Sequence, residues 1–489
     1  ARALEEALKE SLLVPLGDGY KFAPYASDLD AHYRFLHARV QQAAYALLPP
    51  GERPRLHYHI GRLLLENLPN EEREERFFDI ISHWNRGRSA VAAAGEELRH
   101  ARLNLEAARQ AKESAAFGPT LDYARAGIEM LPADAFEHER RLFLDLHLEG
   151  AEAAYLSGDY QTMDRLAGAI LHRPADALTK ARMQEVRLQA AIGRDSQHEA
   201  IQIARTGLAL LGITLPHHSR RSKLQAVLRT RLAMWRHTPD SILELPRLQN
   251  ARIEMALRIL SSATSAAYQV DHGLFMIMLL MQIRISARHG LSHQASYACV
   301  LYSIYETAVK GDPATGYDYG RASVKLQESF GPGYRSRVMC VFHFVSSFWK
   351  EHIRACLPGF DDAYRAGLDT GDYQYASYSA QIQTASCFFW GQDFRALEKT
   401  AAEYTGILEQ VDHRAAIFPH LAYRQATHNL LHGDRNFSIL DGAHFEAVRM
   451  ERIEATGYQL CQLHLAKLVL AYLAGQNDQA LLSLDVLRR

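Results

Sequence analysis

The stretch AYLSG, residues Ala154–Gly158, returns near the other end of the chain as AYLAG, residues Ala471–Gly475. The second copy lies 317 residues after the first. Each copy ends a run of small and apolar residues with a glycine, the residue that most readily adopts the left-handed conformation found after the last turn of many helices. A recurrence of this kind indicates internal repeats, each of which closes with a helix end.

Glycines followed by polar residues mark turns along the whole chain. Their spacings are 40, 35, 118, 80, 42 and 42 residues, for Gly118, Gly158, Gly193, Gly311, Gly391, Gly433 and Gly475. The two long spacings are close to three and two units of about 40 residues, which predicts further turns near residues 232, 271 and 351. A second series agrees, because Gly290 and Gly371 are each followed by Ala-Ser-Tyr at the same offset. Each unit therefore has two turns, one per helix end.

Between the turns, apolar residues recur at helical spacing, as at Leu463, Ala466 and Val469. A single helical hairpin cannot bury its apolar face, so neighbouring hairpins must stack. The predicted fold is all-α, a tetratricopeptide-like α-solenoid of helical hairpins with a long concave surface on which a ligand binds. The unit exceeds the about 34 residues of a strict tetratricopeptide repeat, so HEAT-like packing is the alternative.

The composition of the chain excludes several classes of protein. The chain has 55 lysines and arginines against 56 acidic residues, and 48% of its residues are apolar. It is therefore neither disordered nor broadly attracted to nucleic acid or membranes. The longest apolar run, Leu274–Met281, is far shorter than the about 20 residues of a membrane span and predicts a buried helix. No C-x-x-C pair occurs, and we expect five reduced, buried cysteines in a cytoplasmic protein: Cys299, Cys340, Cys356, Cys387 and Cys461.

Residues 212–248 break the repeat pattern. They contain Pro216, Pro239 and Pro246, and six lysines or arginines without an acid between Arg220 and Arg236. We interpret this segment as a connection with a solvated basic face, with contact to nucleic acid or to an acidic partner as the alternative.

The first 68 residues differ from the repeats. Two short apolar runs flank Gly17–Gly19 and predict a β-hairpin within Ser11–Phe22, and Tyr33–Phe35 alternates like a third short strand. A helix is expected from Ala38 until the prolines at 49 and 50, and Pro54 suits the first turn of another. Helices around a small hairpin predict a winged-helix module.

This region carries a specific resemblance. YRFLHARVQQAAYALLPPGERPRLHYHIGRLLL, residues Tyr33–Leu65, resembles the winged-helix end of signal-transduction ATPases of the STAND class. More narrowly, the chain resembles large bacterial sensor proteins that join a serine/threonine-kinase-like domain, an AAA-type ATPase, a tetratricopeptide-like region and often GAF and histidine-kinase domains. Further matching stretches are Phe77–Gly87, Leu103–Phe117, Ala151–Tyr160 and Phe348–Asp372.

The resemblance implies one site residue. In that class a histidine between strand and helix contacts the ADP phosphate and holds the off state, and the matching residue here is His37. An imidazole there can donate a hydrogen bond to a phosphate oxygen. The class usually has Asp after this histidine, whereas this chain has Ala38, and a purely structural histidine is the alternative.

Other motifs give no active site. Gly311–Tyr317, GDPATGY, has the glycine spacing of a phosphate loop but lacks its lysine. His57 and His59 lie on divergent helix faces without a further ligand, so no metal is expected. We therefore expect a segment without catalytic residues and without its own cofactor.

The predicted function is that of a regulatory sensor region in a longer protein. The solenoid would bind a protein, peptide or small ligand and relay its occupancy to the chain's own ATPase and kinase domains. By the resemblance, the full protein is an ATP-dependent kinase, and ATP or ADP with magnesium belongs to its ATPase domain. The alternatives are a maltose-regulator-type transcription activator and a plain protein-interaction scaffold. No membrane or nucleic-acid partner is expected.

The expected organisation has four parts. Residues 1–68 end a winged-helix module, and 69–211 form a first block of helical repeats. Residues 212–248 are the basic connection, and 249–489 form a second, truncated block.

Overall fold

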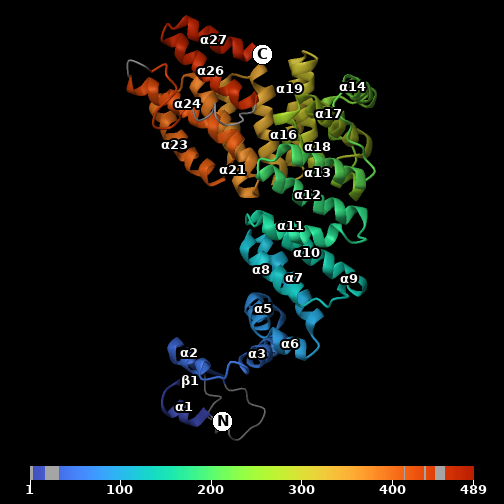
Figure 1. The fold of residues 1–489 in the computed structure, drawn as a ribbon, viewed down its shortest axis with the longest axis vertical. Coiled ribbons are helices and arrows are strands. Elements are labelled where there is room, and N and C mark those ends of the chain that lie inside the picture. Colours follow the sequence, from blue (N-terminus) through green and yellow to red (C-terminus); the bar gives the residue numbers. More distant parts are fainter. Residues whose placement is uncertain (1–3, 17–31, 412, 434–436, 447–456, 489) are drawn as a thin grey trace. The chain divides into compact units, whose positions relative to one another are not determined.

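The computed structural model describes residues 4–16, 32–411, 413–433, 437–446 and 457–488. It divides into two compact units, residues 1–159 and 160–489, each of which is considered by itself. Within the described residues, every named element is helical apart from one two-stranded sheet (Figure 1). The predicted all-α class is therefore confirmed.

The first unit begins with the sheet. Strand β1, Leu13–Leu16, pairs antiparallel with β2, His32–Phe35, so that Leu13 stands opposite Phe35. Helix α1, Glu5–Lys9, precedes the sheet, and α2, Ala38–Ala46, and α3, Arg53–Asn67, follow it. The strand expected at Tyr33–Phe35 and both helices are confirmed, whereas the turn expected at Gly17–Gly19 lies outside the described residues. Assignment of this region to a winged helix stays a prediction.

The rest of the first unit consists of helices that pack on their neighbours in the chain. They are α4 Asn70–Glu75, α5 Phe77–Arg86, α6 Arg88–Ala93, α7 Glu97–Glu113, α8 Phe117–Glu129, α9 Ala135–His138 and α10 Arg140–Leu156. Helix α8 packs on both α7 and α10. Leu105 of α7 and Leu146 of α10 share one buried cluster. Gly127 of α8 allows this close approach, because a Cβ atom there would lie 2.7 Å from the Leu146 side chain.

The second unit is built from longer helices. They are α11 Tyr160–Leu171, α12 Ala177–Gly193, α13 Gln197–Leu210, α14 Arg220–Met234, α15 Pro239–Leu243, α16 Ala251–Val270, α17 His272–His289, α18 His293–Ile304, α19 Pro313–Glu328, α20 Arg335–Val341, α21 Ile353–Thr370, α22 Tyr373–Trp390, α23 Phe394–Val411, α24 Arg414–His432, α26 Gly457–Leu473 and α27 Asn477–Arg488. Short π-helical and 3₁₀ turns join α18 to α19 and lie between α19 and α21: η3 Tyr305–Val309, η4 Pro332–Tyr334, η5 Phe342–Ser346 and η6 Ser347–Trp349.

The stack of helices continues past the basic segment 212–248. Helices α12 and α13, which precede the segment, both pack on α16, which follows it. The segment itself contains α14 and α15, and α14 lies against α17. Buried residues on both sides of the segment belong to one core cluster. The four domain ranges expected from the sequence stay a prediction.

Most of the predicted turns are present. Gly371, Gly391 and Gly433 each follow the last residue of a helix with φ of 74°, 75° and 64°, the left-handed conformation that only glycine adopts readily. Gly158, Gly290, Gly311 and Gly475 also have positive φ. The expected turns near 271 and 351 lie between helices, at the start of α17 and of α21.

Two expected turns are wrong. Gly118 lies in the first turn of α8, and position 232 falls inside α14. The turn expected at Gly193–Asp195 is confirmed, because α12 ends at Gly193 and Asp195 follows with a φ of 58°. Near Gly118 the left-handed residue is Ala115, with a φ of 54°, which a search for glycine turns cannot find.

The cysteine prediction holds for four of the five residues. Cys299, Cys340, Cys356 and Cys387 are free and buried, but Cys461 of α26 is free and exposed, which corrects the expectation for that residue. The apolar run Leu274–Met281 lies in α17 and is largely buried, as predicted. In the part of the chain that the structure describes, no helix combines the length and the apolar character that crossing a membrane requires.

Helices far apart in the sequence meet through polar side chains in the second unit. Gln269 of α16 donates a hydrogen bond to the Tyr378 hydroxyl of α22 at 3.2 Å. Tyr458 of α26 donates to Gln381 of α22 at 2.6 Å, and its ring lies 6.2 Å from that of Tyr268 of α16. Side chains of α16, α22 and α26 therefore contact one another although these helices are far apart in the sequence.

A buried charge pair lies within this unit. Arg337 of α20 donates a hydrogen bond to Asp372 at 2.5 Å, and the two side chains are only 13% and 11% exposed. The guanidinium lies over the rings of Tyr297, Tyr334 and Tyr375, at 5.9, 5.1 and 5.2 Å from their centroids. Burial of both charges is tolerated because each meets an opposite charge or an aromatic face.

Replacing Arg337 should therefore destabilise the second unit. Arg337→Met leaves Asp372 buried and unpaired, and we expect a loss of about 3–5 kcal/mol in the free energy of unfolding, measured by urea denaturation. The matched control is Arg365→Met, since Arg365 is 73% exposed and pairs with Asp361 one turn away. That change should cost about 1 kcal/mol or less. Equal losses of stability from the two substitutions would show that Arg337 and Asp372 do not form a buried charge pair.

Candidate functional site

His37 lies where the sequence places it, between the end of β2 and the start of α2. It is the residue before the first helical position, and its carbonyl oxygen accepts hydrogen bonds from the amides of Val40 and Gln41 at 3.0 and 3.3 Å. Its imidazole is exposed, and no described residue partners it. The side chain is thus accessible to a ligand, while its contact with a nucleotide stays a prediction.

The histidines of α3 have different surroundings. His57 is buried, with Nε2 3.0 Å from the Tyr45 hydroxyl and Nδ1 2.9 Å from Nδ1 of His83. Burial and the nearby His83 lower the pKa of His57. His59 is exposed on another face of the helix. The two imidazoles thus diverge, as expected, and His57 has a structural hydrogen-bonding role.

The phosphate-loop-like stretch Gly311–Tyr317 begins a helix. Asp312 caps α19 by accepting a hydrogen bond from the Thr315 amide at 3.0 Å, and Gly311 has a φ of 72°. The residues therefore form the repeat turn that the sequence predicts.

The basic segment forms a helix with two distinct faces. One face of α14 carries Ala226, Thr230 and Met234, which are buried, and Thr230 donates a hydrogen bond to the Leu280 carbonyl of α17 at 3.2 Å. Ser219 caps the start of the helix, and its hydroxyl accepts a hydrogen bond from the Ser222 amide at 3.0 Å. Before it, His218 pairs with Asp271 at the start of α17 at 2.9 Å. These contacts fix α14 on α17.

A pocket of about 790 Å³ opens beside α14. Its basic lining comes from Arg229 of α14 and from Arg284, Arg288 and His289 of α17. Apolar side chains complete the lining: Ile213, Leu232, Ala233, Ile253, Met281, Ile285 and Ala287. The lining of the pocket thus combines basic and apolar side chains.

The arginines of the pocket lack an acidic partner in the part of the chain that the structure describes. Among the described residues, none forms an ion pair with Arg229, Arg284 or Arg288. Arg284 is half-buried, and burial together with the charge of Arg229 lowers its pKa. Two like charges held in a partly desolvated pocket repel each other, and an anion placed between them would relieve that repulsion.

The outer face of α14 is apolar. Leu224, Leu228, Leu232 and Trp235 are 60%, 55%, 75% and 69% exposed. Their spacing of four, four and three residues places them on one side of the helix, and Leu232 also lines the pocket. Large exposed apolar residues that form one continuous stripe are typical of an interaction site. We call this set the α14 stripe.

The sequence indicates only part of this site. The run of basic residues on α14 is visible, including Arg229. Arg284 and Arg288 follow an apolar run more than fifty residues later, and nothing in their local sequence connects them with α14. Only the packing of α14 on α17 brings the arginines into one pocket.

Comparisons with known proteins give one match in sequence and one in structure. No protein-family model matches the chain. The chain is 20% identical over 424 residues to a protein of Dictyostelium discoideum named hybrid signal transduction histidine kinase G. The match covers 77% of this chain but spans only 12% of the length of that protein.

The structural match is to the crystal structure of a signal transduction ATPase with numerous domains, with a tetratricopeptide repeat sensor, from Pyrococcus horikoshii. It is 12% identical and covers 92% of this chain and 68% of that one, with a TM-score of 0.37.

Replacing Arg284 should stabilise the protein. Arg284→Met removes a desolvated charge beside Arg229 and keeps a chain of similar length, so we expect a gain of about 0.5–2 kcal/mol in the free energy of unfolding by urea denaturation. The gain should shrink in high salt, which screens the repulsion. The control Arg395→Met, at an exposed position of α23, should change stability by less than about 0.5 kcal/mol. A destabilising effect of Arg284→Met would show that this charge is compensated.

Proposed function

We propose that this chain is the sensor region of a multidomain, cytoplasmic signal-transduction ATPase–kinase. The similarity to a hybrid signal transduction histidine kinase over 77% of the chain supports this assignment. So does the resemblance of Tyr33–Leu65 to the winged-helix end of STAND ATPases. In this proposal, ATP binding and kinase activity belong to other parts of the full protein, and the helical stack detects a ligand.

The ligand we propose is an acidic, amphipathic segment of a protein. The observation that carries this proposal is the pairing of Arg229 and Arg284 in one pocket without an acid, directly beside the α14 stripe. An amphipathic helix with leucines on one side and glutamates along their edge is complementary to both features.

The relay needs little energy. A ligand shifts a two-state equilibrium by its difference in affinity for the two states, and a few kcal/mol change the populations substantially. Helix α14 packs on α17, and α17 contributes to the core of the stack. Binding at α14 would therefore change the packing of α17 and, through it, the core. We propose that this favours one arrangement of the stack relative to the ATPase domain.

The ligand proposal is tested with a fluorescent helical peptide that carries a leucine stripe edged by glutamates. Fluorescence anisotropy should detect saturable binding that weakens in salt, because the arginines contribute charge attraction. Arg229→Ala with Arg284→Ala, or Leu228→Ala with Leu232→Ala, should weaken it by about tenfold or more, which corresponds to about 1.4 kcal/mol. Arg395→Ala should leave it unchanged.

A second peptide distinguishes recognition of charge from non-specific hydrophobic binding. In it, lysines replace all the glutamates, and the leucine stripe is the same. We expect it to bind at least about tenfold more weakly, since like charges then oppose each other at the pocket. Equal affinity of the two peptides would disprove an acidic ligand.

His37 provides the test of the nucleotide switch in the full-length protein. His37→Ala removes the hydrogen bond that we propose to the ADP phosphate, and a hydrogen bond to a charged group contributes about 1.5–3 kcal/mol. We therefore expect ADP affinity to fall about tenfold or more and basal kinase output to rise. His59→Ala, at an exposed position of α3, is the control. Unchanged ADP affinity would leave His37 with a structural role.

A further inference from the structure

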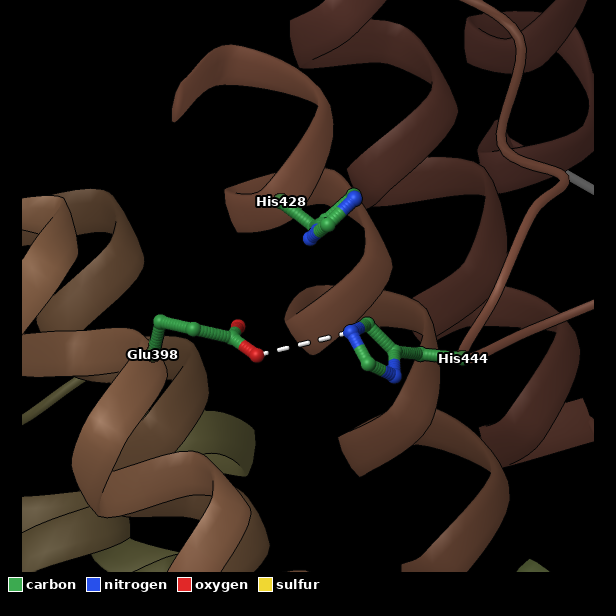
Figure 2. Close-up of side chains that lie close together, drawn as sticks. All are labelled: Glu398, His428 and His444. Carbon is green, nitrogen blue, oxygen red and sulfur yellow. Dashed lines mark ion pairs between the residues drawn. The ribbon is translucent and has the colours of Figure 1, made fainter. Parts of the chain in front are cut away.

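Three side chains with metal-ligating atoms converge within the second unit (Figure 2). Glu398 comes from α23, His428 from α24, and His444 from residues 437–446 after α24, which we call the α24 strap. One ligand atom of each residue lies within 4.8 Å of the corresponding atoms of the other two. His444 Nε2 is 3.4 Å from Glu398 Oε1.

These distances suit a tetrahedral metal ion. Two ligand atoms bound at about 2.1 Å from a tetrahedral zinc ion lie about 3.4 Å apart. The separation of His444 Nε2 from Glu398 Oε1 already has this value. The other pairs, at 4.8 Å or less, need to approach by no more than about 1.5 Å, which small side-chain rotations allow.

One carboxylate oxygen of Glu398 is buried without a hydrogen-bond donor. Its Oε1 atom accepts a hydrogen bond from Arg424 Nε at 3.1 Å. Its Oε2 atom is buried and has no hydrogen-bond partner. A buried acceptor without a partner costs about 1–3 kcal/mol and indicates a bound ion or water. A cation that Glu398 binds through both carboxylate oxygens, Oε1 beside His444 and Oε2, would satisfy this atom.

The α24 strap is held in place independently of any ion. The His444 amide donates a hydrogen bond to the Gln425 side chain of α24 at 2.8 Å. Asn429, one turn further along α24, donates to the carbonyl oxygens of Phe437 and Ile439 at 3.1 and 2.7 Å. His444 is therefore presented from a fixed backbone, as a metal ligand must be.

The charges around the cluster are few. Arg424 is the cation that faces Glu398, and it also donates to Thr405 at 3.1 Å. Burial and the charge of Arg424 lower the pKa of His444. His432, one turn beyond His428 on α24, lies with its ring centroid 4.2 Å from that of His428.

We propose that Glu398, His428 and His444 bind a divalent transition-metal ion, and that zinc fits this set best. Two imidazoles and one carboxylate are a ligand set found in zinc sites with three protein ligands, in which water takes the fourth position. The ion would fasten the α24 strap to α23 and α24. This site lies on other helices than the ligand pocket at α14 and α17. The result of a metal-binding test therefore does not decide whether the proposed function is correct.

The test is titration of the chelator-treated chain with Zn²⁺ by isothermal calorimetry and with Co²⁺ by visible absorption. We expect one ion per chain, a four- or five-coordinate Co²⁺ spectrum, and a thermal midpoint that rises with Zn²⁺ concentration. Glu398→Gln, His428→Ala and His444→Ala should each weaken binding by about tenfold or more and abolish the thermal shift. His198→Ala, at an exposed position of α13, should do neither.

Two further variants distinguish this site from adventitious binding. Arg424→Met removes the cation that competes for Glu398 and should tighten Zn²⁺ binding several-fold, a gain that a misfolded variant would not give. His432→Ala should preserve the affinity. Binding that depends on His428 and His432 but survives Glu398→Gln and His444→Ala would place the ion on α24 alone and overturn the proposal. A six-coordinate Co²⁺ spectrum, or no saturable binding, would also overturn it.

Discussion

Each pair of antiparallel helices in the second unit has an apolar side that only the next pair can cover, and the rest of the structure depends on this constraint. Helices α12 and α13 cover one side of α16, and α17 covers another. Because the stack must stay continuous, the basic segment 212–248 cannot separate α13 from α16. It forms α14 outside that contact, against α17, with its apolar stripe unpaired.

Side chains that contact one another inside the stack are not free for a ligand. Helices α16, α22 and α26 meet through glutamine and tyrosine side chains. Helix α14, in contrast, keeps large apolar side chains exposed. The segment that departs from the repeat is therefore where exposed apolar residues and unneutralised arginines coincide.

The sequence predicted the helical repeats because their signal is local. A glycine in the left-handed conformation commonly follows the last turn of a helix, and Gly371, Gly391 and Gly433 do so. Ala115, which has the same conformation without being a glycine, left no such signal. Neither site was predictable in full, because packing alone joins Arg229 to Arg284, and Glu398 to two histidines 30 and 46 residues later in no recognisable motif.

The distribution of thiols makes the second unit convenient to observe. Four of the five cysteines are buried, and burial raises the pKa of Cys387 to about 11 and of Cys340 to about 12, which suppresses their reactive thiolate form. Cys461 alone is exposed, on α26. Partial burial raises the pKa of the Cys461 thiol too, but its exposure should let a maleimide dye label the native chain first at this position, without any engineered cysteine. Because α26 contacts α16 and α22, emission from the dye would report whether α26 moves away from these two helices.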